Sequence, residues 1–324
     1  MNPEPSRKSN DPSVVVALLN WNNADETMGA LASLGDVVYE NFDVLIVDNG
    51  STDDSVARLK EEVHRITAFQ TNFVLNKENK GFAGGCNTAL QWAFQNKREY
   101  ILLLNNDTEV DKHFLTLLVR TAQEQKDGAV FSPSVYFYDN RSLLWFGGPT
   151  RISFLRMDRA AQCGGFQKKV PQNAPITSLS FATGCAMLCK VDVLEKVQGF
   201  DERFFLYYED VDVSLRIRKA GWNLYWVPES SVYHKVSQTT FSRLGRPIVH
   251  YYDVRNALLF SKKHCPLWGV AYRAIWSCFT VAKQVIKIGI RRNRMVSTAI
   301  LMAVLDYYRG KFGQCEHNNL IISQ

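Results

Sequence analysis

Short apolar runs alternate with segments of helical periodicity along the first third of the chain. The runs are rich in Val, Leu and Ile and have the length of buried strands; they cover Ser13–Leu19, Phe42–Val47, Phe73–Leu75 and Tyr100–Leu104. The segments between them predict helices at about Asp25–Leu34, Asp53–Arg65 and Gly84–Gln95. Strands that are apolar along their whole length are buried on both faces. The alternation therefore predicts an α/β domain with a mostly parallel central sheet flanked by helices.

The middle of the chain is less regular but continues the same architecture. Strands are predicted at Ala129–Tyr138 and Trp222–Val227, and helices at Val191–Val197 and Glu209–Ala220. Glycine pairs and many polar residues between Ser142 and Ala174 indicate loops and a hairpin. We therefore place one domain at residues 13–260. It follows a polar lead-in, residues 1–12, which lacks the apolar stretch of a secretory signal and is expected to be disordered.

The last segment, residues 261–324, has a different character. From Pro266 to Leu305 the pattern is helical, aromatic and basic. Between Lys262 and Lys311 ten Lys and Arg residues stand against one acid, Asp306, so this stretch carries ten minus one, or +9. Since the whole chain carries +6, the remainder carries −3. Such an asymmetry favours an anionic surface as the partner of the C-terminal segment.

Two structures are compatible with this basic segment. Its longest run without a charged residue, Met295–Leu305, is shorter than the roughly 20 apolar residues that a membrane-spanning helix needs. The segment is therefore a basic amphipathic helix in a membrane interface, a helical cap on the main domain, or both. Its aromatic and aliphatic content suits lipid better than a phosphate backbone, so we expect no nucleic-acid partner.

The seven cysteines carry little information about function. Their number is odd and their spacing matches no zinc or redox motif. Free thiols in a reducing cytoplasm explain this pattern best.

Polar clusters follow the predicted strands directly, where ligands bind in parallel α/β sheets. In Asn105-Asn106-Asp107 a carboxylate can hold a divalent cation that neutralises a diphosphate, although such a cluster is also an ordinary turn. The Asp48 carboxylate can accept a hydrogen bond from a pyrimidine N–H, or the Asp48–Asp53 segment is only a loop and a helix cap.

Two further features have both a functional and a structural interpretation. The glycines of Gly81–Gly85 precede a helix, where backbone can approach a phosphate; a tight strand-to-helix connection is the alternative. Glu209 and Asp210 begin a helix whose dipole would keep a carboxylate ionised and ready to accept a proton, yet acids are common in first helical turns for electrostatic reasons alone. His234, a short loop after the Trp222–Val227 strand, matters only if it meets Asp107 in space.

Taken in order, these motifs resemble family 2 glycosyltransferases of the GT-A fold. The early blocks are Val47–Asp53, Asn79–Gly85 and Asn105–Thr108, and the later ones are Thr183–Met187, Gly199–Phe205 and Tyr208–Asp212. Two more blocks, Val232–Lys235 and Tyr252–Asn256, resemble a bacterial rhamnosyltransferase subgroup. The resemblance covers about residues 13–260 and is specific as a set.

The resemblance implies a role for each matching position. Asp48 would bind the nucleotide base, with Asn20 and Asn79 lining that pocket, and the remaining nucleotide-sugar contacts would come from Gly81, Asn105, Asn106 and Asp107. Asp107 matches the last acid of the D-x-D metal motif, while Asn105 replaces the first acid and lowers the negative charge of the site. His234 would complete the shell of a Mg²⁺ or Mn²⁺ ion. Asp210 matches the catalytic base, with Glu209 beside it.

The implied activity is inverting transfer of a sugar from a nucleotide-diphosphate donor. An acceptor hydroxyl would displace the diphosphate directly, so no covalent enzyme intermediate is needed. The subgroup favours dTDP-L-rhamnose as donor, with a UDP-hexose as the nearest alternative. The acceptor would be a growing cell-surface polysaccharide or a lipid-linked oligosaccharide. This places the protein in the cytoplasm, peripheral on the inner face of a bacterial cytoplasmic membrane.

Other classes remain to be weighed against this one. A Rossmann oxidoreductase or a nucleotidyltransferase shares the parallel layout, but the first strand lacks the G-x-G-x-x-G of a dehydrogenase and the Glu209-Asp210 pair has no evident task in either. A non-catalytic nucleotide-sugar-binding homologue is favoured by Asn105. The intact Asp107, Asp210 and His234 argue against it.

Overall fold

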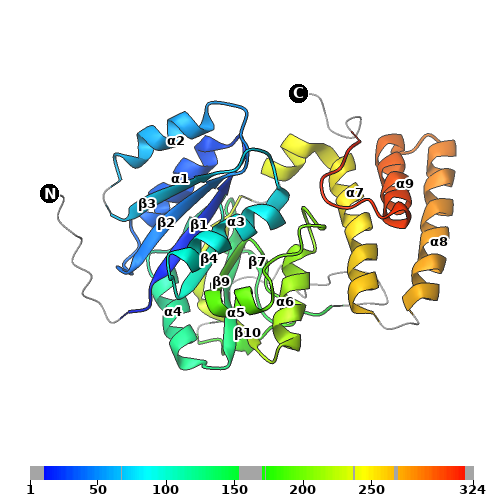
Figure 1. Cartoon of the computed structure of the whole chain (residues 1–324). Coiled ribbons are helices and arrows are strands. Elements are labelled where there is room, and N and C mark those ends of the chain that lie inside the picture. Colours follow the sequence, from blue (N-terminus) through cyan, green and yellow to red (C-terminus); the bar gives the residue numbers. More distant parts are fainter. Residues whose placement is uncertain are drawn as a thin grey trace.

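A three-layer α/β/α unit makes up most of the protein, and a group of helices lies beside it (Figure 1). The structure is a computed structural model that describes residues 11–66, 68–152, 170–171, 173–235, 238–265 and 269–317. Most of the expected lead-in, and residues 153–169 of the expected hairpin region, lie outside the described residues.

One mixed sheet forms the middle layer. Its strands are β1 (Val14–Asn20), β2 (Phe42–Asp48), β3 (Gln70–Leu75), β4 (Tyr100–Asn105), β5 (Thr108–Val110), β6 (Gly128–Phe137), β7 (Leu144–Phe146), β8 (Thr177–Ser178), β9 (Ala186–Lys190) and β10 (Asn223–His234). Their order is β3-β2-β1-β4-β9-β6-β10-β5, with β7 on β6 and β8 on β10. The strands β1 to β4 pair in parallel as expected, and β6 pairs in parallel with β10. The strand β9 is antiparallel to both of its neighbours, so the parallel arrangement is interrupted at its centre.

Helices cover both faces of the sheet. One face carries α1 (Ala24–Leu34), α2 (Ser55–Val63) and α4 (Phe114–Glu124); the other carries α3 (Gly81–Gln95), α5 (Val191–Lys196) and α6 (Glu209–Lys219). The alternation is clear in β1, where Val14, Val16 and Leu18 enter one core and Val15 and Ala17 the other. Such burial on both faces explains why the strands are apolar along their whole length.

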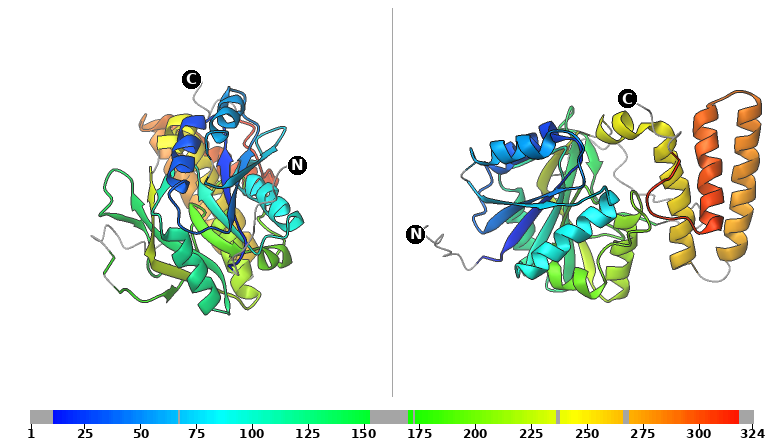
Figure 2. Two further views of the ribbon diagram at one scale, coloured as in Figure 1. Left: turned by 90° about the vertical axis from the view of Figure 1, so that its left-hand side faces the viewer. Right: turned by 45° about the horizontal axis from the view of Figure 1, so that its top comes forward.

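Three more helices follow the sheet domain. They are α7 (Gln238–His264), α8 (Gly269–Gly289) and α9 (Arg294–Arg309). The helix α7 is interrupted at Gly245, whose φ is +77°, two residues before Pro247. Figures 1 and 2 show α9 between α7 and α8, with α8 outermost. Within the described residues no helix is long and apolar enough to cross a membrane.

The strand register aligns the polar clusters that the sequence analysis singled out. Asn20 of β1 is paired with Asp48 of β2, and Leu19 is paired with Asn105 of β4. Because these strands are parallel, their carboxyl ends meet at one edge of the sheet. Asn20, Asp48 and Asn105 therefore lie side by side although the chain separates them.

Some element boundaries differ from those expected. Helix α3 begins at Gly81 rather than Gly84, and the Ala83 amide donates to the carbonyl of Phe205, which gives that helix-start N–H a partner. Strand β10 does not end at Pro228: it continues to His234 through a register shift between Val227 and Ser231. A bulge tolerates a proline, which has no N–H for the ladder, so no loop separates His234 from the strand. The six cysteines that the described residues include are free, as expected.

Candidate active site

Hydrogen bonds surround the carboxylate of Asp48. Asn20 Nδ2 donates to Asp48 Oδ2 at 2.9 Å, and Ser51 donates to the same carboxylate from its amide (2.9 Å) and its hydroxyl (2.6 Å). Asn20 is fully buried, and its Oδ1 accepts the hydroxyl of Thr27 at 2.9 Å. Asn106 Nδ2 in turn donates to that hydroxyl oxygen at 2.9 Å. Both ends of the Asn20 carboxamide are thus used, and Asn20 orients Asp48.

Asn79 and Gly81 belong to a second cluster, built around Asn49. Asn79 Oδ1 accepts hydrogen bonds from Asn49 Nδ2 (3.1 Å) and from the amide of Gly81 (2.8 Å). Gly81 has a φ of +71°, and a Cβ there would lie 2.4 Å from the carbonyl oxygen of Phe205, so no larger residue fits. Since Asn49 follows Asp48 directly, the cluster joins the start of α3 to the Asp48 carboxylate.

The structure brings Asp107 and His234 together. Asp107 lies in the turn between β4 and β5, and β5 pairs antiparallel with the end of β10, with Thr108 opposite His234. Asp107 Oδ1 is 3.1 Å from His234 Nε2, and both side chains are buried. The condition that the sequence left open for His234 is therefore met by the pairing of two strands.

Electrostatics favour a charged imidazole in this pair. Burial disfavours the imidazolium, but the adjacent Cys185 and the Asp107 carboxylate outweigh it and raise the pKa of His234 to about 10. Burial also raises the pKa of the Cys185 thiol. This pKa applies to His234 without a metal, and a cation that binds Nε2 must displace the proton, because a ligating imidazole is neutral.

Asp107 and His234 fit a divalent cation as two of its ligands. Carboxylates suit Mg²⁺ and Mn²⁺, and imidazole is a common ligand of transition metals. In the described part of the chain no group of three or more His, Cys, Asp and Glu side chains is arranged to hold a metal. A cation at this pair therefore needs water or the oxygens of a diphosphate for its other ligands, as is usual for Mg²⁺.

Glu209 and Asp210 begin α6, and both are buried. Asp210 Oδ2 accepts the amide of Gly184 at 3.1 Å, and Asp210 Oδ1 accepts the amide of Val211 at 2.8 Å. Burial raises the pKa of the nearby Cys86 thiol, and the charges of Glu209 and Asp210 raise it further. That thiol is therefore neutral at neutral pH and competes with neither carboxylate as a base.

A tight turn connects Asp210 with the Asp107–His234 pair. Gly184, which binds the Asp210 carboxylate, precedes Cys185, whose carbonyl accepts the amide of Asn105 at 2.8 Å. The thiol of Cys185 adjoins His234. The candidate base and the candidate metal ligands thus stand on either side of one turn.

Asp212 has a structural task that distinguishes it from Asp210. It is fully buried and accepts hydrogen bonds from Arg216 Nε (2.8 Å), Lys263 Nζ (2.9 Å) and His264 Nε2 (2.7 Å). Burial alone would raise the pKa of Asp212, but these partners outweigh it and lower the pKa. Lys263 also binds Asp201 at 2.7 Å. Asp212 therefore fastens α6 to the end of α7.

Residues 13–198, more than half of the chain, match the family model described as "Glycosyl transferase family 2". This chain belongs to glycosyl transferase family 2. The match spans the Asp48, Asn79–Gly81 and Asn105–Asp107 clusters, and it makes the protein a glycosyltransferase enzyme, as the sequence motifs predicted.

Curated relatives of this glycosyltransferase include two with rhamnosyl activity in their names. The N-acetylglucosaminyl-diphospho-decaprenol L-rhamnosyltransferase of Mycobacterium tuberculosis is 24% identical over 230 residues, covering 65% of this chain and 72% of the relative. The dTDP-rhamnosyl transferase RfbF of Shigella flexneri is 23% identical over 323 residues, covering 94% of this chain and 99% of RfbF. The predicted resemblance to rhamnosyltransferases is confirmed at this modest identity.

A solved structure confirms the fold of the glycosyltransferase. The mannosyltransferase PcManGT from Pyrobaculum calidifontis, in complex with GDP-Man and Mn²⁺, has a TM-score of 0.58 and 15% identity, covering 93% of this chain and 88% of its own. The predicted GT-A fold, with its central sheet and C-terminal helices, is thereby confirmed.

Several residues of the site were not identified from the sequence. Thr27 binds Asn106, Asn49 binds Asn79, and Ser51 binds Asp48. Asn49 and Ser51 lie within the quoted Val47–Asp53 block, but they received no role. Arg255 and Asn256 lie within the quoted Tyr252–Asn256 block but received no role. Both are completely buried. A fully buried arginine is rare enough to mark a task, yet burial cannot be read from the sequence.

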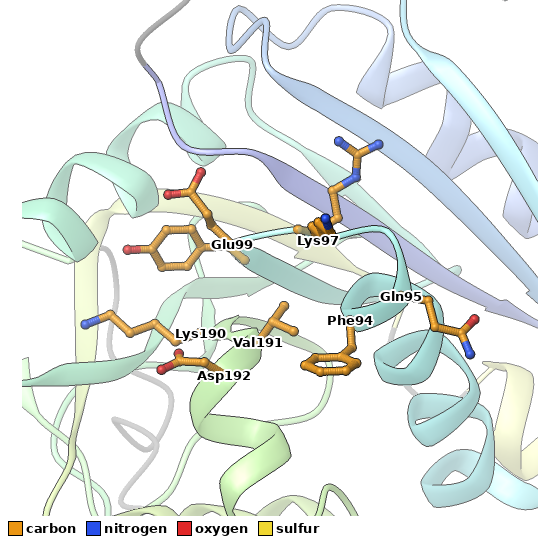
Figure 3. A pocket seen from close by; sticks show the side chains of 9 residues that line it. Phe94, Gln95, Lys97, Glu99, Lys190, Val191 and Asp192 are labelled. Carbon is orange, nitrogen blue, oxygen red and sulfur yellow. The ribbon is translucent and has the colours of Figure 1, made fainter.

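A separate hollow of about 640 Å³ lies at the opposite edge of the sheet (Figure 3). It is lined by the end of α3, the residues before β4 and the β9–α5 junction, including Phe94, Lys97, Lys190 and Asp192. Tyr100, at the amino end of β4, also lines it, whereas Asn105 ends β4 at the candidate site. The hollow therefore takes no part in the site.

Proposed function

We propose that this glycosyltransferase transfers a sugar, with inversion, from a nucleotide-diphosphate donor to a hydroxyl group. The observation that carries the proposal is the turn at Gly184–Cys185, which joins the buried Asp210 carboxylate to the Asp107–His234 pair. An inverting displacement needs a base on the acceptor side of the anomeric carbon and charge stabilisation on the diphosphate side. This arrangement supports one of each at close quarters.

In the mechanism we infer, Asp210 removes the proton of the acceptor hydroxyl as its oxygen attacks the anomeric carbon. The amide of Gly184 holds Asp210 Oδ2, which leaves the carboxylate oriented before the acceptor arrives. Glu209, beside it, adds negative charge at the same helix start. Since one displacement completes the transfer, no residue has to act as a nucleophile.

On the donor side, Asp48 receives the base and the start of α3 at Gly81 receives the phosphates. Asn20 and Asn79 support this pocket by orienting Asp48 and closing the Asn49 cluster. Asn105 and Asn106 extend it along the sheet edge to Asp107. Asp107 and His234 would hold Mg²⁺ or Mn²⁺, which when bound neutralises the charge of the leaving diphosphate.

The proposed donor is dTDP-L-rhamnose, with a UDP-hexose as the alternative. The near full-length match to RfbF, a dTDP-rhamnosyl transferase, supports the first. The acceptor we propose is a growing cell-surface polysaccharide or a lipid-linked oligosaccharide. The diphospho-decaprenol named in the mycobacterial relative supports a lipid-linked one.

We propose residues 13–260 as the catalytic domain and residues 261–324 as a segment that keeps the enzyme at the inner face of a bacterial cytoplasmic membrane. The net charge of +9 between Lys262 and Lys311 supports this assignment, since that face carries anionic lipid. Association would be peripheral.

The decisive experiment measures binding and turnover of a panel of nucleotide-sugars, each with and without Mn²⁺. Turnover of dTDP-L-rhamnose that depends on the metal is the expected result. A preference for a UDP-sugar would replace the donor and keep the reaction. If no nucleotide-sugar binds with or without Mn²⁺, the proposal is wrong, and binding without any turnover would favour the non-catalytic nucleotide-sugar-binding homologue.

A further inference from the structure

Helix α8 presents large apolar side chains to solvent. Ile275, Phe279, Ile286 and Ile290 are exposed by 68%, 73%, 64% and 65%. Their spacing of four, seven and four residues places them on one face of α8, with Ile290 directly after the end of the helix. Figures 1 and 2 show α8 as the outermost helix, so other described elements do not cover this face. We call these four side chains the outer stripe.

The buried side chains of α8 are the polar Arg273, Ser277 and Gln284, and the half-buried Tyr272, Trp276 and Val281 pack against the core around them. Gln284 accepts the hydroxyl of Ser297 of α9 at 3.1 Å, Ser277 accepts the hydroxyl of Tyr308 at 3.1 Å, and buried Arg273 reaches the carbonyl of Ser261. A surface helix such as α4 instead buries mainly apolar side chains. The orientation of α8 therefore leaves an apolar surface for something outside the described chain.

Charge decides what that partner is. Lys283, Lys287, Arg291, Arg292 and Arg294 lie beside or just after the outer stripe, and α8 contains no acidic residue. A second copy of the chain packed symmetrically on this face would set these cations against themselves. An anionic lipid surface offers both the apolar depth and the opposite charge.

We propose that α8 lies in the headgroup region of an anionic bilayer with the outer stripe inserted. The proposal rests on the membrane association proposed above and identifies the surface that would make the contact. It does not depend on which sugar the enzyme transfers, or on whether it transfers one.

The test is flotation of the full chain with vesicles of phosphatidylcholine alone or with about one third phosphatidylglycerol. The double variant Phe279→Asp/Ile286→Asp should lose about tenfold or more of the wild-type binding to the anionic vesicles, because inserted apolar area and charge attraction set such affinities. Phe94→Asp, which changes an equally large exposed phenylalanine on α3, is the matched control and should bind as wild type does.

Two outcomes overturn the docking proposal. One is unchanged vesicle binding by the double variant. The other is a concentration-dependent dimer in light scattering that only the double variant abolishes, without vesicle binding by wild type; the stripe would then be a self-association surface. Donor turnover in solution should be equal in all variants. A loss of turnover would therefore test the proposed enzyme function, and a loss of vesicle binding would test the docking surface.

A different observation concerns the segment just before the Glu209-Asp210 pair. Phe205, Tyr207 and Tyr208 have φ values of 63°, 68° and 74°, in the left-handed region that aromatic residues rarely occupy. Strain of this kind persists only where the surroundings impose it. Helix α6 starts directly after Tyr208, so the position of Asp210 depends on this segment.

Two buried side chains of α7 bind the strained segment. Asn256 Nδ2 is within hydrogen-bond distance of three carbonyl oxygens as a donor. It lies 2.7 Å from those of Phe204 and Leu206 and 2.9 Å from that of Tyr207. Arg255 donates to the carbonyls of Phe204 (3.2 Å) and Gly313 (2.8 Å), and its Nε holds Asn256 Oδ1 at 3.1 Å.

The other side of the segment meets the donor pocket. The Phe205 carbonyl accepts the amide of Ala83 at 3.3 Å and lies against Gly81, and the Phe205 ring stacks on Tyr252 at 5.4 Å. The segment is therefore held between α7 and the start of α3.

We propose that Arg255 and Asn256 are positioning residues that fix segment 203–208 and thereby set Asp210 against the donor. The proposal rests on Asp210 being the base. Since neither side chain touches a substrate in this assignment, each acts through the backbone carbonyls that it binds.

Asn256→Asp tests this most directly, because the shape is kept and the donor group is lost. We expect transfer to fall by about 100-fold in kcat, as a displacement near 1 Å can cause, with nucleoside diphosphate affinity within about twofold of wild type. Hydrogen–deuterium exchange should rise in the peptide spanning residues 203–212 and stay unchanged in β1 and β2. Arg255→Lys, which keeps the charge but cannot bridge two carbonyls, should show the same pattern more weakly.

Ser297→Ala is the matched control, since it removes a buried hydrogen bond between α8 and α9 in which residues 203–208 take no part. A merely structural role for Asn256 would make Asn256→Asp resemble Ser297→Ala, with lower thermal stability but normal kcat per folded molecule. That result, or unchanged exchange at residues 203–212, overturns the proposal. If wild type transfers no sugar, the exchange measurement still decides on the segment.

Discussion

The two halves of the candidate site are held in place by different means. On the donor side Asn20, Asp48 and Asn105 end neighbouring strands, and backbone ladders fix their relative positions. On the acceptor side Asp210 follows an irregular segment with three left-handed residues, and that segment is held by Asn256 and Arg255, about fifty residues further along the chain. In a regular sheet the backbone hydrogen bonds between strands also fix the positions of the side chains at the strand ends. An irregular backbone needs buried donors to hold its carbonyls, and α7 supplies them here.

The largest expected effect separates the two halves. Asp210→Asn removes the base but leaves every donor-side contact, so transfer should fall by about 10²- to 10⁴-fold while the affinity for nucleotide-sugar stays near wild type. Single-turnover transfer and equilibrium binding of the donor measure the two quantities.

Glu124→Gln, which alters an exposed carboxylate on α4, serves as the control for Asp210→Asn and should change neither quantity. Near-normal transfer by Asp210→Asn would show that another residue is the base and that the two halves of the site do not have the proposed separate roles.

The next largest effect concerns the metal pair. Asp107→Asn and His234→Ala should each lower metal-dependent transfer by about 10²- to 10³-fold, since each removes a group that stabilises the charge of the leaving diphosphate. Both should also weaken Mn²⁺ binding in the presence of nucleoside diphosphate, which electron paramagnetic resonance reports without any turnover.

Asn105→Asp sharpens this experiment. It restores the acid that the metal motif lacks and should tighten Mn²⁺ binding. If Asp107→Asn and His234→Ala bind Mn²⁺ as wild type does, the ion is held elsewhere or not used.

The smallest expected effect is on stability in acid. The folded pKa of Asp212 is below its ordinary value of 3.8, so Asp212 stabilises the fold above that pH and loses this contribution as the pH falls below it. Lys263→Met removes a partner that Asp212 shares with Asp201 and should cost about 1–3 kcal/mol at pH 7. The difference from wild type should shrink below pH 3.8. Urea unfolding at pH 7 and below pH 3.8 measures it, and a difference that is independent of pH would show that the carboxylates bound by Lys263 are not responsible.

The sequence alone predicted the positions of the polar residues at the strand ends well, because their signals are local. Continuous apolar runs marked β1, β2 and β4, and the polar residues directly after them were correctly expected at one edge of the sheet. Gly81 was expected either to let backbone approach a phosphate or to make a tight strand-to-helix connection, and the collision of a Cβ there with Phe205 fits the tight connection. The free state of the described cysteines followed from their number and spacing.

Tertiary structure decided the rest, because it depends on which distant segments meet. The contact between Asp107 and His234 arises from antiparallel pairing of β5 with β10, and no local pattern encodes a pairing partner. Asp210 and Asp212 look alike in the sequence, yet only the position of α7 turns Asp212 into a structural anchor. Periodicity also showed that the C-terminal helices are amphipathic, but it cannot tell which face meets the protein. In α8 the buried side chains are the polar Arg273, Ser277 and Gln284, and only the packing of α9 and α7 determines this.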